Sequence, residues 1–134
     1  MHALEIIHTA LRPGGVLLDI RPAQQQPWIE VSRAETCTRL GRIDDRYRMG
    51  TLAVADAALE TVIEAGLFER EVEITFPFIY HCGDLDTWLA YMADHWSSAT
   101  VDATLTERAR EALREDTGGL RILRAIHTAR LRRA

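Results

Sequence analysis

The last apolar segment of the chain constrains the fold more than any other feature. Residues 120–131 carry apolar side chains at both even and odd positions, among them Ile122, Leu123, Ile126 and Leu131. A strand that is apolar on both faces belongs in the middle of a sheet. The sequence therefore predicts a sheet whose central strand comes from the C-terminal end of the chain.

Two further segments have the character of strands. Residues 71–79 alternate apolar and polar side chains, with Val72 and Phe76 pointing one way. Pro77 lies inside this segment and cannot donate a hydrogen bond to a neighbouring strand, which predicts an edge position. Residues 16–20 form a nearly continuous apolar run, and we expect that strand to be covered on both faces.

Four segments have the apolar spacing, caps or stop signals of helices. The first ends at Pro13, and Gly66 is placed to end the second. Trp88 and Trp96 lie on one face of the third, where we expect them to pack in the core. The expected helices are residues 3–12, a helix capped by Thr51 and running to about Ala65, a helix capped by Asp84, and a helix from Thr106 to near Asp116.

Residues 28–43 are compatible with two structures. Ser32 followed by Glu35 fits the capping box of a short helix. The β-propensity of Thr36 and Cys37 instead fits a hairpin with arms at Trp28 to Ser32 and at Thr36 to Ile43. We favour the hairpin.

Length and composition exclude several classes of protein. A chain of 134 residues supports one domain over residues 1–134. Its net charge of −4, without a basic patch interleaved with aromatic residues, argues against nucleic-acid binding. No apolar stretch approaches the length needed to span a bilayer. Cys37 and Cys82 are too few for a disulfide framework, so we expect a reduced, cytoplasmic protein.

The opening residues resemble a known family. Residues 4–21 read Leu-Glu-Ile-Ile-His-Thr-Ala-Leu-Arg-Pro-Gly-Gly-Val-Leu-Leu-Asp-Ile-Arg, with an L-R-P-G-G turn before an apolar strand. This pattern is similar to the middle of class I S-adenosylmethionine-dependent methyltransferases, and the Glu64-Ala65-Gly66 turn also follows their order. The resemblance implies an α/β fold, namely a truncated Rossmann-like methyltransferase that consists of the C-terminal half and lacks the cofactor-binding half. It implies a mixed sheet with the last strand antiparallel and central, helices packed on the sheet, and residues 28–43 as an extra hairpin.

The resemblance does not extend to the cofactor site. That family binds its cofactor at a glycine-rich turn after its first strand, and no G-x-G or G-x-x-G follows an N-terminal strand here. We therefore expect no catalytic residues and no cofactor of its own, with S-adenosylmethionine bound only if a partner supplies the missing half. The first hypothesis is a non-catalytic protein with an assembly, regulatory or small-ligand-binding role. The alternatives are the C-terminal half of a split methyltransferase and a small α+β ligand-binding pocket protein.

Losing the family's first half would leave the strand at Val16–Ile20 without a neighbour on one side. An apolar strand edge is a site of association. We expect a second copy of the chain to cover it, with a partner chain or the hairpin at 28–43 as alternatives. If both faces are buried, Asp or Arg in place of Leu18 should cause unfolding or aggregation.

Five residues are expected to lie near the carboxyl ends of the strands, where ligands bind in open α/β sheets. Arg21 could hold an anion and His81 could act as a base. We expect no metal site, because His81 and Cys82 lack a second pair of ligands at a recognisable spacing. The predicted pocket rim consists of Arg21, Trp28, Tyr80, His81 and Cys82.

Overall fold

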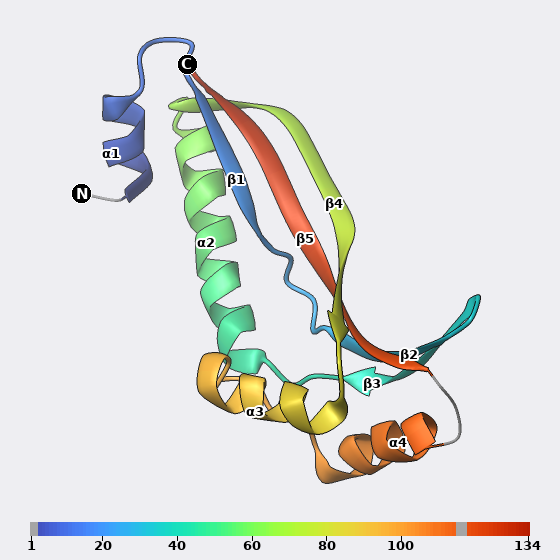
Figure 1. The fold of residues 1–134 in the computed structure, drawn as a ribbon. Coiled ribbons are helices and arrows are strands. Elements are labelled where there is room, and N and C mark those ends of the chain that lie inside the picture. The colour runs from blue at the N-terminus through green and yellow to red at the C-terminus, as the bar shows by residue number, and fades with distance from the viewer. Residues whose placement is uncertain (1–2, 115–117) are drawn as a thin grey trace. The chain divides into compact units, whose positions relative to one another are not determined.

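The computed structural model describes residues 3–114 and 118–134, which form four helices and five strands (Figure 1). The expectation of an α/β chain is confirmed. In chain order the elements are α1 (Ala3–Ala10), β1 (Val16–Pro22), β2 (Trp28–Arg33), β3 (Thr36–Arg42), α2 (Arg46–Glu64), β4 (Phe68–Cys82), α3 (Leu85–His95), α4 (Ala103–Arg114) and β5 (Gly119–Arg133).

The sheet is built around β5. Residues 126–132 of β5 pair with β1, and residues 119–123 pair with β2, which in turn pairs with β3. β4 also pairs with β5. The predicted central position of the last strand is confirmed, and among the described strands β4 has β5 as its one neighbour, as an edge strand containing Pro77 should. The expectation of a mixed sheet is wrong, because the sheet is antiparallel.

The chain divides into two compact units. The first unit comprises residues 1–24, 50–76 and 126–134, and the second comprises residues 25–49 and 77–125. β4, β5 and α2 each contribute residues to both units. Each unit has its own buried apolar cluster, and the two are described separately.

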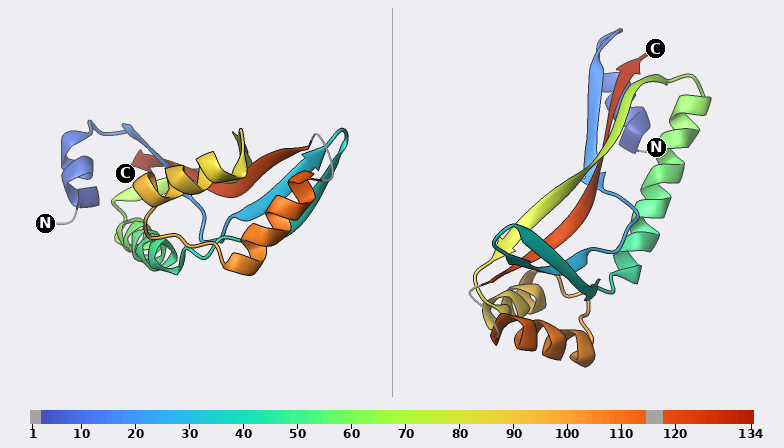
Figure 2. Two further views of the ribbon diagram at one scale, coloured as in Figure 1. Left: turned by 60° about the horizontal axis from the view of Figure 1, so that its bottom comes forward. Right: turned by 90° about the vertical axis from the view of Figure 1, so that its right-hand side faces the viewer.

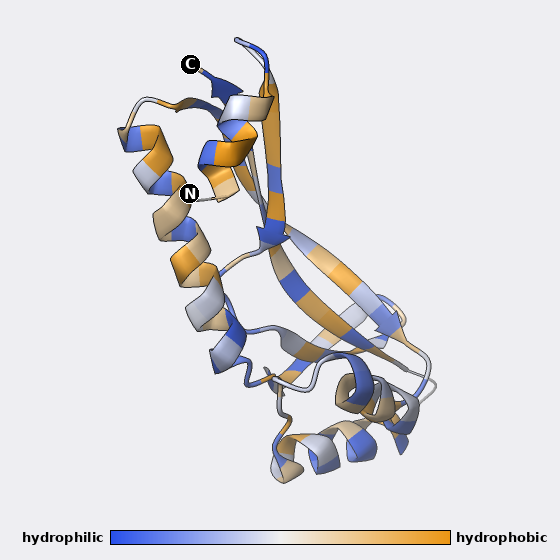
Figure 3. Ribbon diagram, turned by 90° about the vertical axis from the view of Figure 1, so that its left-hand side faces the viewer, coloured by the Kyte–Doolittle hydropathy of each residue, from blue (hydrophilic) through white to orange (hydrophobic). Residues whose placement is uncertain are grey.

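The core of the first unit lies between α1, α2 and the sheet. Its buried residues are Leu59, Val62, Phe68 and Leu131. The apolar residues of α1 and α2 appear as orange bands in Figure 3. Gly66 follows α2 with a φ of +71°, a left-handed conformation that glycine adopts without steric cost. The predicted helix end is therefore confirmed.

β1 differs from its prediction. Leu17 packs in the core of the first unit, but Leu18 is 59% exposed and Ile20 is 64% exposed. The expectation of a strand buried on both faces is wrong, because α1 and α2 cover the face that carries Leu17. The expected unfolding or aggregation on placing a charge at Leu18 depended on that burial, so it no longer follows.

The second unit contains the hairpin and two helices. β2 and β3 pair antiparallel, with Arg33 opposite Thr36, which confirms the hairpin at residues 28–43. α4 packs against both strands, and Figure 2 shows it alongside the hairpin. A Cβ built on Gly41 of β3 would lie 2.7 Å from Leu105 Cδ1, so the glycine allows α4 to approach closely.

Helix starts were predicted with mixed success. Asp84 caps α3 as expected, since its side chain accepts a hydrogen bond from Thr87 N at 2.8 Å. The expectation that Thr106 caps the next helix is wrong. α4 begins at Ala103, and Asp102 Oδ1 accepts from Leu105 N at 2.8 Å. The predicted helix end at Asp116 lies outside the described residues.

α2 also begins earlier than predicted. The sequence favours a start at Thr51, but the helix begins at Arg46. The backbone N–H of Met49 donates to Asp45 O at 3.0 Å, which makes Asp45 the residue immediately before the first turn. Asp45 and the first turn of α2, which contains Arg48, belong to the second unit.

Candidate anion-binding site

Backbone hydrogen bonds position the segment that precedes α2. Ile43 N donates to Pro27 O at 2.9 Å, and Asp44 exchanges two hydrogen bonds with Thr100 at 2.9 and 2.8 Å. These bonds join the end of the hairpin to the segment that follows α3. As a result, Asp45 lies beside residues that are more than 50 positions later in the chain.

Asp45 is fully buried and has several partners. Its carboxylate accepts hydrogen bonds from Trp96 Nε1 at 3.0 Å and Ser98 Oγ at 3.3 Å. Arg48 Nε lies 3.3 Å and Arg124 Nη2 lies 3.5 Å from Asp45 Oδ2. A buried carboxylate is costly unless it is paired and hydrogen-bonded, and here both conditions are met.

The two guanidinium groups share this one carboxylate. Arg124 lies over the Trp96 ring, 4.2 Å from the ring centroid, and Arg48 lies 5.8 Å from the same centroid. Burial, together with repulsion from Arg48, lowers the pKa of Arg124 from its usual value. One positive charge is therefore left over, and a negatively charged group placed between the two side chains would reduce their repulsion.

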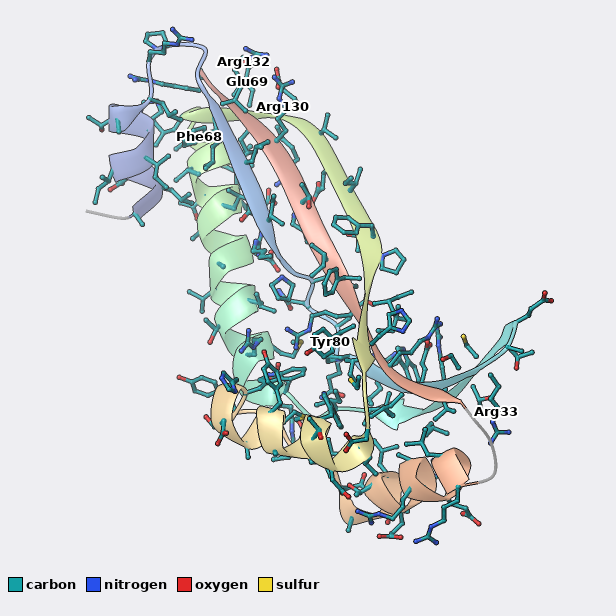
Figure 4. The ribbon with its side chains drawn as sticks, in the orientation of Figure 1. Arg33, Phe68, Glu69, Tyr80, Arg130 and Arg132 are labelled. Atoms are coloured by element: carbon teal, nitrogen blue, oxygen red, sulfur yellow. The ribbon has the colours of Figure 1, made fainter. Side chains whose placement is uncertain are left out.

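Aromatic rings form the wall next to these charges. Tyr80 of β4 stacks on Tyr91 of α3 with ring centroids 6.2 Å apart and an interplanar angle of 20°. Tyr91 stacks on His95, one helical turn later, at 4.6 Å and 10°. Figure 4 shows Tyr80 projecting from the part of β4 that belongs to the second unit. The three rings make a row of flat aromatic surface beside the arginines.

These side chains enclose a cavity of about 290 Å³ that opens to solvent. Its floor includes Trp88 and Ile122, each 4% exposed. All of its lining residues belong to the second unit. They are Arg48, Phe78, Tyr80, Trp88, Tyr91, His95, Trp96, Ile122 and Arg124.

The five residues of the predicted pocket rim have different surroundings. Tyr80 lines the cavity. Trp28 lies under the guanidinium groups of Arg39 and Arg42, at 5.1 and 4.2 Å from the ring centroid. His81 is exposed on β4. The shared rim of all five residues stays a prediction.

The remaining two members of that rim are Cys82 and Arg21. Cys82 packs against the core of the second unit, and its burial raises the pKa of the thiol to about 11. Arg21 belongs to the first unit, where it pairs with Asp19 at 2.7 Å and with Asp56.

Sequence reasoning missed the charged residues of the cavity. Asp45, Arg48 and Arg124 come from three separate segments, and the pattern of each segment is explained by a helix start or a strand. One signal was present: Arg124 is one of several arginines that interrupt the apolar residues of the predicted central strand. Charged residues in such strands are rarely buried without a partner.

Comparison with known proteins identifies no relative, since no family model, curated protein or solved structure matches the chain. Residues 3–114 and 118–134 contain no group of three or more His, Cys, Asp or Glu that could hold a metal ion. None of the described helices is both long and apolar enough to cross a membrane.

Proposed function

We propose that the second unit binds a small aromatic anion, such as an aromatic carboxylate, in the cavity beside Arg48 and Arg124. The observation that carries this proposal is the charge imbalance at Asp45, where two guanidinium groups share one carboxylate. With this function the chain would be a small α+β protein that binds a ligand in a pocket.

The chemistry of the cavity matches such a ligand in two ways. A carboxylate can accept charge-assisted hydrogen bonds from Arg48 and Arg124, which are stronger than bonds between neutral groups. An aromatic ring can lie against the row of Tyr80, Tyr91 and His95. The volume of about 290 Å³ is close to the lower end for ligand pockets, about 300 Å³, and favours a ligand with one or two rings.

Calorimetric titration with matched small molecules tests the proposal. Benzoate and indole-3-acetate should bind, whereas benzamide lacks the charge and acetate lacks the ring, so both should bind at least tenfold more weakly. Inorganic phosphate serves as a probe for an anion site without aromatic selectivity. Equal binding of benzoate and benzamide, or no binding of either, would contradict the proposal.

Variants connect the binding to the site. Arg124→Gln should reduce benzoate affinity by at least tenfold, because it removes the guanidinium that lies over Trp96. Arg110→Gln is the matched control, since Arg110 pairs with Asp86 and Glu107 on the surface of the same unit. Benzoate affinity that is unchanged in Arg124→Gln would place the ligand elsewhere.

A second candidate function keeps the methyltransferase resemblance. It is favoured by one observation: β5 pairs with both β1 and β4, which is the strand order that the resemblance implies. In this proposal the chain is a methyltransferase-like half without its own cofactor site. Its role is then assembly or regulation, or it is completed by a separate cofactor-binding half. Titration of S-adenosylmethionine onto the chain tests it, and micromolar binding would contradict the absence of a cofactor site.

A further inference from the structure

One edge of β1 is open to another strand. β1 pairs with β5 along one side, and no strand in the described part of the chain pairs with its other side. Arg133 N donates to Gly15 O at 2.8 Å, so the backbone groups of Gly15 point toward β5. Because these directions alternate along an antiparallel strand, the N–H and C=O of Leu18 and Ile20 point away from β5.

The side chains at this edge are apolar and exposed. Leu18 is 59% exposed and Ile20 is 64% exposed. Their neighbours Leu17 and Asp19 point to the opposite face, where Leu17 packs against α1 and α2. An exposed apolar strand with outward-facing backbone groups is a template for pairing with another chain.

We propose that β1 pairs antiparallel with β1 of a second copy of this chain, about a twofold axis that passes through Ile20. This interaction is independent of the ligand-binding function proposed above. It assigns one occupant to the open edge and one register to the pairing.

Charge complementarity selects a second copy and this register. Arg21 Nε lies 2.7 Å from Asp19 Oδ2, and the same guanidinium also pairs with Asp56. The two residues that flank Ile20 therefore carry opposite charges, which makes this segment complementary to an antiparallel copy of itself. A twofold axis at Ile20 sets Asp19 opposite Arg21 of the second copy, and does so twice. Directly opposed residues of unlike charge stabilise antiparallel pairs, and like charges destabilise them.

The alternative registers lack this match. An axis at Asp19 places the two Asp19 carboxylates opposite each other. An axis at Leu18 places Asp19 opposite Leu17 and forms no charge pair between strands. With the axis at Ile20, Ile20 of one chain faces Ile20 of the other, and Leu18 faces Pro22 of the other chain. Apolar residues therefore also meet apolar residues.

The other sheet edges are less suited to self-pairing. β3 carries Arg39 and Arg42 and no acidic residue, so two copies of β3 would repel each other. β4 contains Pro77, which lacks an N–H and interrupts a hydrogen-bonded ladder. Pro22 ends β1, so in the proposed register the Leu18 C=O receives no hydrogen bond from the opposite strand. The ladder still forms at its centre, because the two Ile20 residues exchange hydrogen bonds and each Leu18 N–H can donate to a Pro22 C=O.

Sedimentation velocity of the full chain over a range of concentrations is the first test. The wild-type chain should shift from monomer to dimer as concentration rises, and Ile20→Lys should stay monomeric. Val72→Lys is the matched control, because Val72 is 49% exposed on β4 of the same unit, and β4 pairs with β5 and not with β1. This variant should leave the dimer intact. A monomeric wild-type chain at every concentration, or equal dimerisation of the two variants, would overturn the proposal.

Charge exchange tests the register. Asp19→Arg should not dimerise alone, because the introduced guanidinium would face Arg21 of the second copy. Arg21→Asp should not dimerise alone either, because two acids would then face each other. A mixture of the two variants should form a heterodimer, because position 19 of each chain then faces position 21 of the other with the opposite charge in both pairs. Loss of dimerisation in both variants without rescue by mixing would overturn the register.

Cysteine cross-linking gives an independent readout. In a Cys37→Ser/Cys82→Ala background, Ile20→Cys should form a disulfide-linked dimer under mild oxidation, because directly opposed Cα atoms lie about 5.5 Å apart, within disulfide range. Leu18→Cys should not cross-link, since the two substituted positions would be about 13 Å apart along the strands. Preferential cross-linking of Leu18→Cys or Asp19→Cys would overturn the axis at Ile20.

Discussion

The indole Nε1–H of Trp96 donates a hydrogen bond to Asp45 Oδ2 at 3.0 Å and so joins the end of α3 to the residue before α2. The same carboxylate oxygen faces Arg48 and Arg124. Asp45 therefore has two effects: it stabilises the fold by satisfying buried donors, and it competes with any anion that enters the cavity.

Asp45→Asn should separate these two effects. Removing the negative charge leaves Arg48 and Arg124 without a counterion, so the free energy of unfolding should fall by about 3 kcal/mol. In the protein that remains folded, benzoate should bind more tightly, because the ligand no longer competes with a resident carboxylate. Urea denaturation and calorimetric titration measure the two quantities.

Asp94→Asn is the control for that variant. Asp94 is an exposed acid on α3 in the same unit, and its replacement changes the net charge equally. Both measurements should stay close to wild type. A weaker affinity for benzoate in Asp45→Asn would contradict the proposed position of the anion.

Gly41→Ala should destabilise the second unit. The added methyl group would lie 2.7 Å from Leu105 Cδ1, and Leu105 is buried between α4 and the hairpin. Overpacking of this kind costs about 1–3 kcal/mol.

Gly50→Ala should instead raise the free energy of unfolding. Gly50 lies within α2 with nothing within 4 Å of an added Cβ, so alanine should stabilise that helix by about 0.5–1 kcal/mol. Urea denaturation of the two variants should therefore move the midpoint in opposite directions, and equal shifts would contradict the close packing of α4 on β3.

Asp102→Ala tests where α4 begins. The side chain of Asp102 satisfies the N–H of Leu105, and loss of such a cap costs about 1 kcal/mol. Thr106→Ala should change the free energy of unfolding much less, because Thr106 lies inside the helix and its hydroxyl donates to Asp102 O. A larger loss of stability in Thr106→Ala than in Asp102→Ala would instead support Thr106 as the cap, as the sequence favours.

Backbone-level features were predictable from particular residues. The apolar residues at both parities between Leu120 and Leu131 indicated the central strand, and Pro77 indicated an edge. The β-propensity of Thr36 and Cys37 indicated the hairpin. Each of these signals is local, because it depends on which conformations a short segment tolerates and how many of its faces are apolar.

Exposure and the cavity were not predictable in the same way. Leu18 and Ile20 are as apolar as buried strand residues, and the sequence does not state which face the helices will cover. The cavity charges come from Asp45, Arg48 and Arg124, which the fold brings together from distant segments. The burial of Asp45 depends on hydrogen bonds from Trp96 and Ser98, which no periodicity encodes.

The two cysteines should differ in reactivity. Cys82 is half-buried, and burial raises the pKa of its thiol from 9.0 to about 11, whereas Cys37 is exposed on β3. Because the thiolate is the reactive form, Cys82 should react with iodoacetamide much more slowly than Cys37 at pH 8. The rate at Cys82 should continue to rise up to about pH 11, as the thiolate fraction increases.

The same raised pKa affects stability at alkaline pH. Between about pH 9 and pH 11 the unfolded chain loses the Cys82 proton while the folded chain retains it. The folded state then binds more protons, so the free energy of unfolding falls as the pH rises through this window. Cys82→Ala should remove this part of the pH dependence, and Cys37→Ser is the control. Urea denaturation at pH 8 and pH 10 measures the change in stability.

Mass spectrometry of alkylated peptides measures the reactivity of the two cysteines. Equal alkylation of the two cysteines at pH 8 would show that Cys82 is not held in the core of the second unit.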